Sequence, residues 1–325
     1  MKKFRNIILS GLLFLGLNQS CKKDFIEGYD VDPNRPLDVS MDVLLTSSEA
    51  YTIYVTSSDL PRITNVIMQQ MTGADRQFLA IDRYVIAGSD FILNHIHSNY
   101  DIKAKSTVVK RGIDEKYFSK TNVSDQEIKK LKDSMNIDDK KFIILFPGRL
   151  TYWKGQKLFI ESLNILNQKK LLENVYAFII GGHQGRINYK EELIQMIKNY
   201  KLGDKLMIAH SLSKIPVAYS IANLVVSCST EPESFGRISV EAQSMEKPVL
   251  ASDIGGSLET VINNKTGWLF KNNDIHDLSE KIKMIIKTEQ NVLNLIGRQG
   301  RKNVKENYTR ELMVSRTLEI YRSLV

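Results

Sequence analysis

The second half of the chain contains the stretch Glu231-Pro-Glu-Ser-Phe-Gly-Arg-Ile-Ser-Val-Glu241, which follows the apolar run Asn223-Leu-Val-Val-Ser-Cys228. Apolar residues at helical spacing continue beyond it, and the strand-like Pro248-Val-Leu-Ala-Ser252 comes next. This order predicts a strand, a tight loop, a helix and another strand. A loop that leads into a helix presents backbone N–H groups at the positive end of the helix dipole, which favours phosphate or another anion. Because the carboxylates of Glu233 and Glu241 can accept hydrogen bonds from hydroxyl groups, the stretch suits a ligand such as a nucleotide sugar.

These residues resemble the E-x7-E signature of family 4 retaining glycosyltransferases of the GT-B type, with Glu233 and Glu241 in the acidic positions. Two glutamates eight positions apart are frequent on solvated helices, so this spacing alone is a weak signal. The residues around the pair and the later Lys247-Pro-Val-Leu-Ala-Ser-Asp-Ile-Gly-Gly256 make the match specific. The resemblance implies the Rossmann-like donor half of a GT-B enzyme that transfers a hexose with retention from a nucleoside-diphosphate sugar.

The resemblance also implies roles for individual residues. It assigns Glu233, the catalytic candidate, to the hydroxyls of the donor sugar, and Glu241 to the ribose. It assigns the Phe235-Gly236 backbone to sugar and phosphate. The donor-binding candidates in this segment are Ser234, Phe235, Gly236 and Glu241.

A second motif, Pro147-Gly-Arg-Leu-Thr-Tyr-Trp-Lys-Gly155, follows the apolar run Phe142-Ile-Ile-Leu-Phe146. Gly148 allows the backbone to approach a ligand closely, while Arg149 and Lys154 can clamp a diphosphate. The alternative is a loop at a helix start with two solvated cations. The resemblance assigns both cations to neutralising the departing nucleoside diphosphate.

From Lys141 onward, short apolar segments alternate with amphipathic ones. This alternation predicts an α/β fold with a doubly wound parallel sheet, in which ligands bind at the carboxyl ends of the strands. The expected strands are 142–146, 175–180, 205–210, 223–228, 248–252 and 267–270.

The composition of the 325 residues, 42% apolar and 25% charged, is that of a globular protein with a formal charge of +8. Residues 1–84 carry nine basic and ten acidic side chains, so the basic surplus belongs to the remainder. Aromatic residues do not alternate with basic ones and no zinc-ligand spacing occurs, which argues against nucleic-acid binding. Without an Asp-x-Asp motif near a strand end, we expect no metal and no cofactor. The positive charge allows membrane association.

The N-terminus has a basic start, Met1-Lys-Lys-Phe-Arg5, and a short apolar run, Ile7–Leu17, which predict a signal peptide over residues 1–20. Cys21 follows, and this order resembles a bacterial lipoprotein site in which the thiol receives lipid. The alternative is a signal with an incidental cysteine. Residues 21–84 resemble the start of SusD/RagB-like outer-membrane lipoproteins and predict a short, mostly helical or irregular segment.

The character of the sequence changes near Tyr84-Val85, so we expect the glycosyltransferase family 4-like domain to span residues 85–325. The glycine-rich acceptor loop of a GT-B enzyme has no match before residue 85, so the resemblance implies only the donor half. The expected partners are a nucleoside-diphosphate sugar and a glycan or lipid-linked acceptor. The alternatives are an outer-membrane nutrient-binding lipoprotein fragment and a non-functional chimera. The signal and Cys21 indicate an outer-membrane or periplasmic protein, whereas the donor half indicates a cytoplasmic or inner-membrane-peripheral one.

Some expectations concern single positions. The family has glycine where Glu246 stands, so this residue is expected to need a positive φ at a cost of about 1 kcal/mol. His183 and Arg186 are weaker candidates for the edge of the donor site. The last helix is expected to leave apolar surface exposed through Leu312, Val314, Leu318, Ile320 and Tyr321.

Overall fold

The computed structural model describes residues 84–100, 105–138 and 140–324. The chain divides into two units, residues 1–81 and 82–325, and all described residues belong to the second. The predicted signal peptide, Cys21 and, apart from Tyr84, the SusD-like segment lie outside the described residues. They stay predictions.

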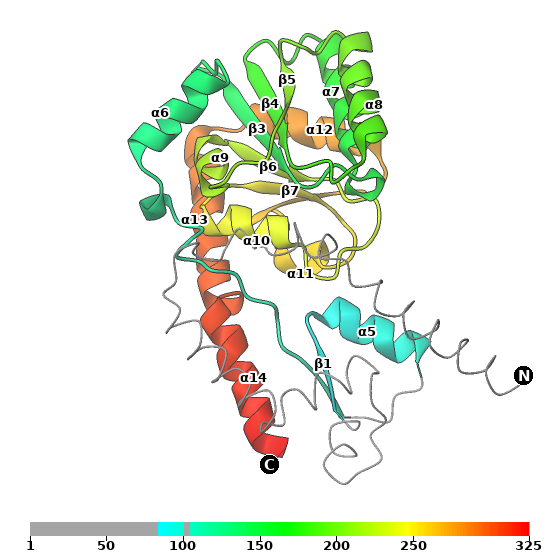
Figure 1. Cartoon of the computed structure of the whole chain (residues 1–325), viewed down its shortest axis with the longest axis vertical. Helices are drawn as coiled ribbons and strands as arrows, with labels where there is room; N and C mark the ends of the chain where they lie inside the picture. Colours follow the sequence, from blue (N-terminus) through cyan, green and yellow to red (C-terminus); the bar gives the residue numbers. More distant parts are fainter. Residues whose placement is uncertain (1–83, 101–104, 139, 325) are drawn as a thin grey trace, which may run out of the picture. The chain divides into compact units, whose positions relative to one another are not determined.

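A parallel sheet of six strands forms the centre of the described chain (Figure 1). Its spatial order is β5-β4-β3-β6-β7-β8, and every neighbouring pair is parallel. The strands are β3 (Phe142–Pro147), β4 (Val175–Ile180), β5 (Leu206–Ala209), β6 (Leu224–Ser227), β7 (Val249–Ser252) and β8 (Gly267–Phe270). The predicted doubly wound α/β fold is therefore confirmed.

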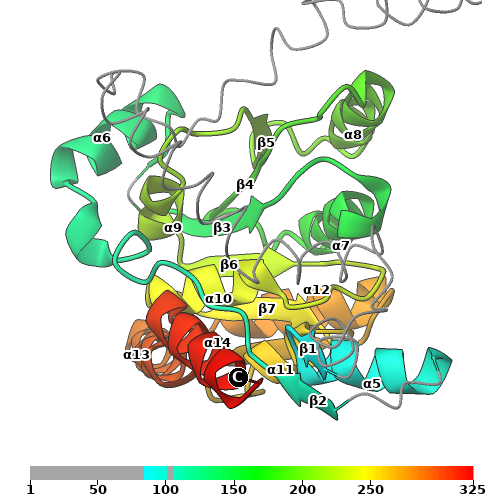
Figure 2. The ribbon, with the colours of Figure 1, turned by 60° about the horizontal axis from the view of Figure 1, so that its bottom comes forward.

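Successive side chains of β3 point to opposite faces of the sheet and enter two separate cores. Ile144 and Phe146 belong to one core, and Ile143 and Leu145 to the other. The first core also takes buried residues from α7 (Gln156–Gln168), α8 (Ile187–Asn199) and α12 (Ile275–Ile286). The second takes them from α9 (Pro216–Ile221) and α10 (Arg237–Ser244). Figure 2 shows these two sets of helices on opposite sides of the sheet.

Residues 84–108 form a smaller parallel unit. The strands β1 (Tyr84–Ala87) and β2 (Lys105–Val108) pair in parallel, and α5 (Asp90–Asn99) lies between them in the sequence. The join predicted at Tyr84-Val85 therefore falls within β1. Beyond β2 come the short helix η2 (Lys120–Asn122) and α6 (Asp125–Ser134).

Several segments complete the described chain. They are the short helix η3 (Tyr152–Lys154), α11 (Ser257–Thr260), α13 (Gln290–Asn307) and α14 (Arg310–Leu324).

Glu246 has φ +54°, so the predicted left-handed conformation at this position is confirmed. The carbonyl oxygen of Glu246 lies against Gly297 of α13, where an added Cβ would approach it to 2.1 Å.

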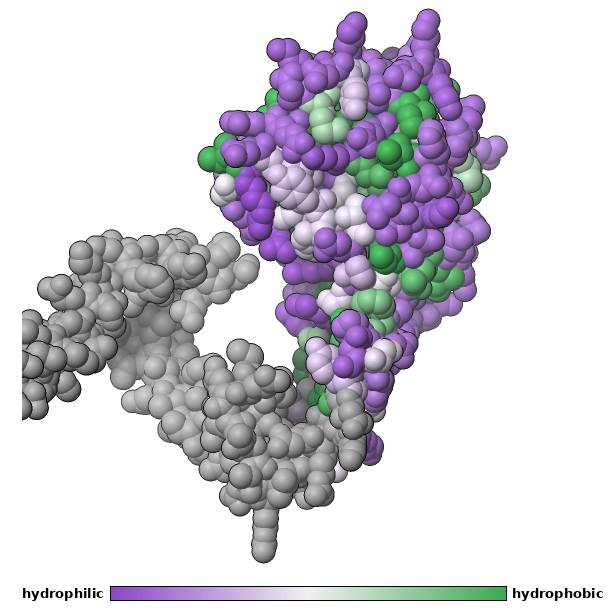
Figure 3. Space-filling view, turned by 90° about the vertical axis from the view of Figure 1, so that its right-hand side faces the viewer, coloured by the Kyte–Doolittle hydropathy of each residue, from purple (hydrophilic) through white to green (hydrophobic). Residues whose placement is uncertain are grey.

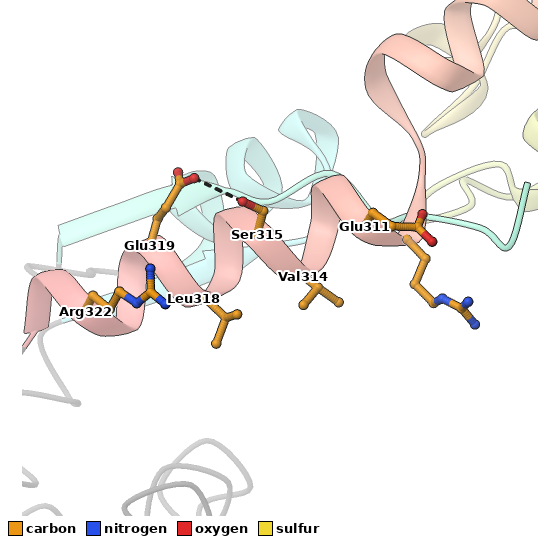
Figure 4. Close-up of a pocket in the computed structure, with 7 residues that line it drawn as sticks. Glu311, Val314, Ser315, Leu318, Glu319 and Arg322 are labelled. Carbon is orange, nitrogen blue, oxygen red and sulfur yellow. Dashed lines mark hydrogen bonds between the residues drawn. The ribbon is translucent and has the colours of Figure 1, made fainter.

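The last helix, α14, leaves apolar side chains in contact with solvent, as predicted. Val314 is 46% exposed and Leu318 is 45% exposed, while Leu312, Ile320 and Tyr321 are half-buried. Val314 and Leu318 project from one side of the helix and line a pocket (Figure 4). None of the candidate site residues lines this pocket.

One face of the described chain is shown in Figure 3. Hydrophilic side chains predominate on this face, and apolar ones gather in small separate patches (Figure 3). None of the helices in the described part is both long and apolar enough to cross a membrane.

Candidate functional site

The two sequence motifs meet at the carboxyl ends of the two central strands, where the order of the strands reverses. The strand β3 is flanked by β4 on one side and by β6 on the other, so β3 and β6 lie at the topological switch point of the sheet. In open α/β sheets, ligands bind at this point, in the crevice outside the carboxyl ends of the strands. The loops after β3 and β6 touch, because the backbone N–H of Thr230 donates to the carbonyl of Trp153 at 2.8 Å. Gly155, with φ +75°, allows the close approach, since a Cβ there would lie 1.9 Å from the carbonyl oxygen of Cys228.

Lys154 and Glu233 form an ion pair across this crevice. Lys154 Nζ lies 2.7 Å from Glu233 Oε1, and their side chains are only 10% and 13% exposed. The Ser229 hydroxyl donates to the same oxygen, and the ring of Trp153 lies 4.4 Å from Lys154 Nζ. No described residue hydrogen-bonds to Glu233 Oε2. One carboxylate oxygen is therefore held in place, and the other is available to a ligand.

Two glycines after β7, Gly255 and Gly256, pack against the backbone of the loop that carries Glu233. The N–H of Gly256 donates to the Glu233 carbonyl at 2.7 Å. A Cβ at Gly255 or Gly256 would lie within 2.7 Å of the backbone of Glu233 or Phe235. This packing explains why Gly255-Gly256 accompanies the acidic motif in the sequence.

Gly236 ends the loop in a left-handed conformation, φ +74°, and α10 begins directly after it without a side-chain cap. The backbone N–H groups of Arg237 and Ile238 find no acceptor within the described chain. The hydroxyl of Ser239, in the same turn, is buried and likewise has no described partner. Unpaired donors at a helix start are suited to binding an anion.

On the opposite side of the crevice, Gly148 and Arg149 follow β3. Gly148 has φ +147°, and Gly181 packs so closely on it that a Cβ at Gly181 would lie 1.8 Å from its carbonyl oxygen. Arg149 is exposed, and its guanidinium donates to Gln184 Oε1 at 3.4 Å.

Arg186, a weaker candidate in the sequence, donates to the same oxygen of Gln184 at 3.4 Å. The structure thus brings Arg149 and Arg186 to one acceptor, and neither forms an ion pair with a described residue. His183 lies beside them with a buried ring Nδ1 that has no partner among the described residues. The sequence did not indicate a role for Gln184, because an amide in a loop carries no motif of its own.

Glu241 lies one turn further along α10 and is 8% exposed. Its Oε1 accepts from Arg237 Nε at 2.6 Å, and its Oε2 accepts from Tyr219 Oη at 2.8 Å. Burial raises the pKa of the Glu241 carboxyl, and the hydrogen bonds from Arg237 and Tyr219 oppose this shift. The sequence did not predict roles for Tyr219 and Ser229, because a single hydroxyl in an apolar segment does not indicate a partner that is distant in the sequence.

The candidate residues thus gather at the carboxyl ends of β3 and β6. Ser234, in the same loop, accepts through its carbonyl from the Ser89 hydroxyl at 2.6 Å. Among the described residues there is no group of three or more His, Cys, Asp or Glu side chains that could hold a metal ion. The arrangement offers cations, unpaired N–H groups and carboxylates to one ligand.

Two curated glycosyltransferases are similar in sequence to part of this chain. The chain is 28% identical over 185 residues to the capsular polysaccharide biosynthesis glycosyltransferase CapM of Staphylococcus aureus, which covers 57% of this chain and 47% of CapM. It is 30% identical over 193 residues to the human alpha-1,3/1,6-mannosyltransferase ALG2, which covers 56% of this chain and 45% of ALG2. The chain therefore spans about half the length of these curated relatives.

Solved structures share the fold. A glycosyltransferase from Rickettsia africae superposes with a TM-score of 0.70 at 32% identity, covering 75% of this chain and 64% of that one. Anabaena HepE, solved in complex with UDP and glucose, has a TM-score of 0.67 at 25% identity, covering 74% and 63%.

The sequence profile of one family, described as glycosyl transferases group 1, matches residues 127–305. This match includes both motifs and more than half of the chain. The chain therefore belongs to the glycosyl transferases group 1 family.

Proposed function

We propose that residues 85–325 form the donor-binding half of a GT-B glycosyltransferase that transfers a hexose with retention from a nucleoside-diphosphate sugar. The observation that carries this proposal is the Lys154–Glu233 ion pair at the switch point of the sheet, beside the uncapped start of α10. The solved complex of Anabaena HepE with UDP and glucose supports this ligand class.

The proposed roles follow from the charges and donors in the crevice. The diphosphate binds to the free N–H groups at the start of α10 and to Arg149 and Lys154, and these cations neutralise it as it leaves. When Lys154 turns to the phosphate, the carboxylate of Glu233 becomes free to accept hydrogen bonds from the sugar hydroxyls. Glu241 accepts from the ribose.

The chemical step replaces one bond at the anomeric carbon by another. The bond to the diphosphate oxygen breaks, a hydroxyl of a glycan or lipid-linked acceptor forms the new glycosidic bond, and its proton passes to the departing phosphate. Protein cations stabilise the charge on the leaving group, so the proposal needs no metal and no cofactor. We also propose that the enzyme works at the cytoplasmic side of the inner membrane, where its basic surface can associate with anionic lipid.

Calorimetric titration of the full chain with UDP, GDP, ADP and UDP-glucose tests the proposal. We expect one nucleotide to bind, and the double variant Arg149→Ala, Glu233→Ala to lose most of that affinity. Absence of binding to every nucleotide, or equal affinity in the double variant, would overturn the proposal. Retention has its own readout, because slow hydrolysis of UDP-glucose followed by proton NMR should release the α-anomer first.

The alternative function, an outer-membrane nutrient-binding lipoprotein, rests on residues 1–84. Labelling of Cys21 with palmitate, followed by fractionation of the cells, tests it. An unlabelled protein in the cytoplasmic fraction would exclude it.

A further inference from the structure

Tyr219 is a buried phenol whose polar partner lies inside the candidate site. The side chain is fully buried, and its ring packs edge-on against Phe118 with ring centroids 5.9 Å apart. Its hydroxyl donates to Glu241 Oε2 at 2.8 Å, and no other described residue hydrogen-bonds to it. A buried tyrosine hydroxyl usually finds a hydrogen-bond partner. Here that partner is the carboxylate of Glu241.

The two oxygens of Glu241 have partners of different accessibility. Oε2 is bound from the interior by Tyr219, which is fixed by its packing in α9. Oε1 is bound by Arg237, whose side chain is 64% exposed and can move aside. Only Oε1 can therefore exchange its partner for a ligand hydroxyl without disturbing the core.

The geometry points to Tyr219 as a positioning residue that holds Glu241 by one oxygen and turns the other toward the ribose of the donor nucleotide. This inference rests on the proposed function, since it needs a nucleotide in the crevice. In the bound state a ribose hydroxyl donates to Glu241 Oε1 in the place that Arg237 occupies here. Tyr219 itself does not touch the ligand.

The variant Tyr219→Phe tests this role, because it removes the hydroxyl and keeps the ring. Affinity of the full chain is measured for UDP and for 2′,3′-dideoxy-UDP, which lacks both ribose hydroxyls. We expect the wild type to prefer UDP by about tenfold or more, which corresponds to one good hydrogen bond to a charged group. In Tyr219→Phe the ratio of the affinities for UDP and for 2′,3′-dideoxy-UDP should fall toward one. The same fall is expected in Glu241→Gln.

The matched control is Tyr308→Phe. Tyr308 is also buried, and its hydroxyl donates to the Glu259 carbonyl at 2.8 Å, so this variant loses a comparable hydrogen bond outside the ribose position. We expect it to keep the preference for UDP, and thermal unfolding shows that each variant is folded.

The pH dependence of UDP binding provides a second readout that loss of stability alone would not move. The charged and titratable groups near Glu241 are Arg237 on its own helix, Tyr219 on α9, Lys154 in η3 and Tyr117 before η2. The Tyr219 hydroxyl favours the ionised carboxylate, so its removal raises the pKa of Glu241 further. As the pH falls, whatever preference for UDP remains in Tyr219→Phe should therefore be lost at a higher pH than in the wild type.

The outcomes separate the inference from the proposed function. If the wild type binds UDP and discriminates against the dideoxy analogue, but Tyr219→Phe discriminates equally well, the inference is wrong and the proposed function stands. A wild type that binds both nucleotides equally also overturns the inference. If the wild type binds neither these nor the GDP and ADP pairs, the proposed function fails and the inference fails with it.

Discussion

Among single residues, Glu246 shows what a left-handed backbone conformation costs a residue that is not glycine. It holds φ +54° in the turn between α10 and β7, and its carboxylate lies 2.8 Å from Lys120 Nζ. A left-handed conformation costs an L-residue roughly 1–2 kcal/mol. An exposed ion pair such as this one stabilises the folded state by only about 0–1 kcal/mol. Local strain therefore remains at the end of the helix that carries Glu241.

Replacing Glu246 by glycine should relieve this strain. Glu246→Gln serves as the control, because it removes the ion pair but keeps the backbone constraint. We expect Glu246→Gly to exceed Glu246→Gln in free energy of unfolding by about 0.5–1 kcal/mol in urea titrations. A glycine variant that is no more stable than the glutamine variant would contradict the assignment of strain.

The Lys154–Glu233 pair should behave as a coupled, buried unit. Lys154→Met leaves the carboxylate without its cation, and we expect it to lower the free energy of unfolding by about 3 kcal/mol. The double variant Lys154→Met, Glu233→Gln should lose less stability than the two single variants together. We expect the difference in free energy of unfolding to be about 1–3 kcal/mol. Chemical denaturation of the four proteins measures this coupling. Additive effects would show that the pair is not coupled in solution.

At the scale of elements, the site depends on how α10 is held. Its N-terminal turn faces the crevice, and its C-terminal end packs on α13 through Gly297 and Gly300. Glycine is the poorest helix former apart from proline, so two glycines within α13 need a structural reason. The reason is close contact, because a Cβ at Gly300 would lie 2.9 Å from the Gln243 side chain.

Gly297→Ala tests this contact. On an exposed helix this change stabilises by up to about 1 kcal/mol. Here the new Cβ would lie 2.1 Å from the Glu246 carbonyl oxygen, so we expect a loss of about 2 kcal/mol or more. Gly203→Ala, where nothing lies within 4 Å of the new atom, should change stability little. A neutral Gly297→Ala in thermal unfolding would contradict the packing.

At the scale of the whole molecule, the fold was more predictable from the sequence than the contacts within the site. The strands lie within one residue of their predicted ends, because short apolar runs bounded by polar loops determine them locally. Glu233 and Lys154 were also predicted, since both stand in motifs at strand ends. Their ion pair, the support from Ser229 and the contact from Tyr219 were not predicted. These contacts join residues far apart in the sequence, and only the packed sheet brings them together.

The exposed apolar side chains of α14 should make the protein self-associate. Replacing Val314 by Thr and Leu318 by Gln removes the most exposed apolar side chains of this helix. We expect the apparent molar mass from static light scattering to depend less on protein concentration, and the Tm to stay unchanged. Met284→Gln, at a residue of α12 that is 42% exposed, is the matched control and should not alter association. Equal effects of the two changes would show that α14 has no special role.

We expect a sugar nucleotide to bind where the loops after β3 and β6 meet. Hydrogen–deuterium exchange of the full chain is therefore measured alone and with UDP-glucose, GDP-glucose or ADP-glucose, because the proposed ligand takes up the free backbone N–H groups at the start of α10. With the sugar nucleotide that binds, we predict slower exchange in residues 148–154 and 234–240. Exchange that is unchanged in both segments with all three, or protection confined to other parts of the chain, would show that the nucleotide does not bind there.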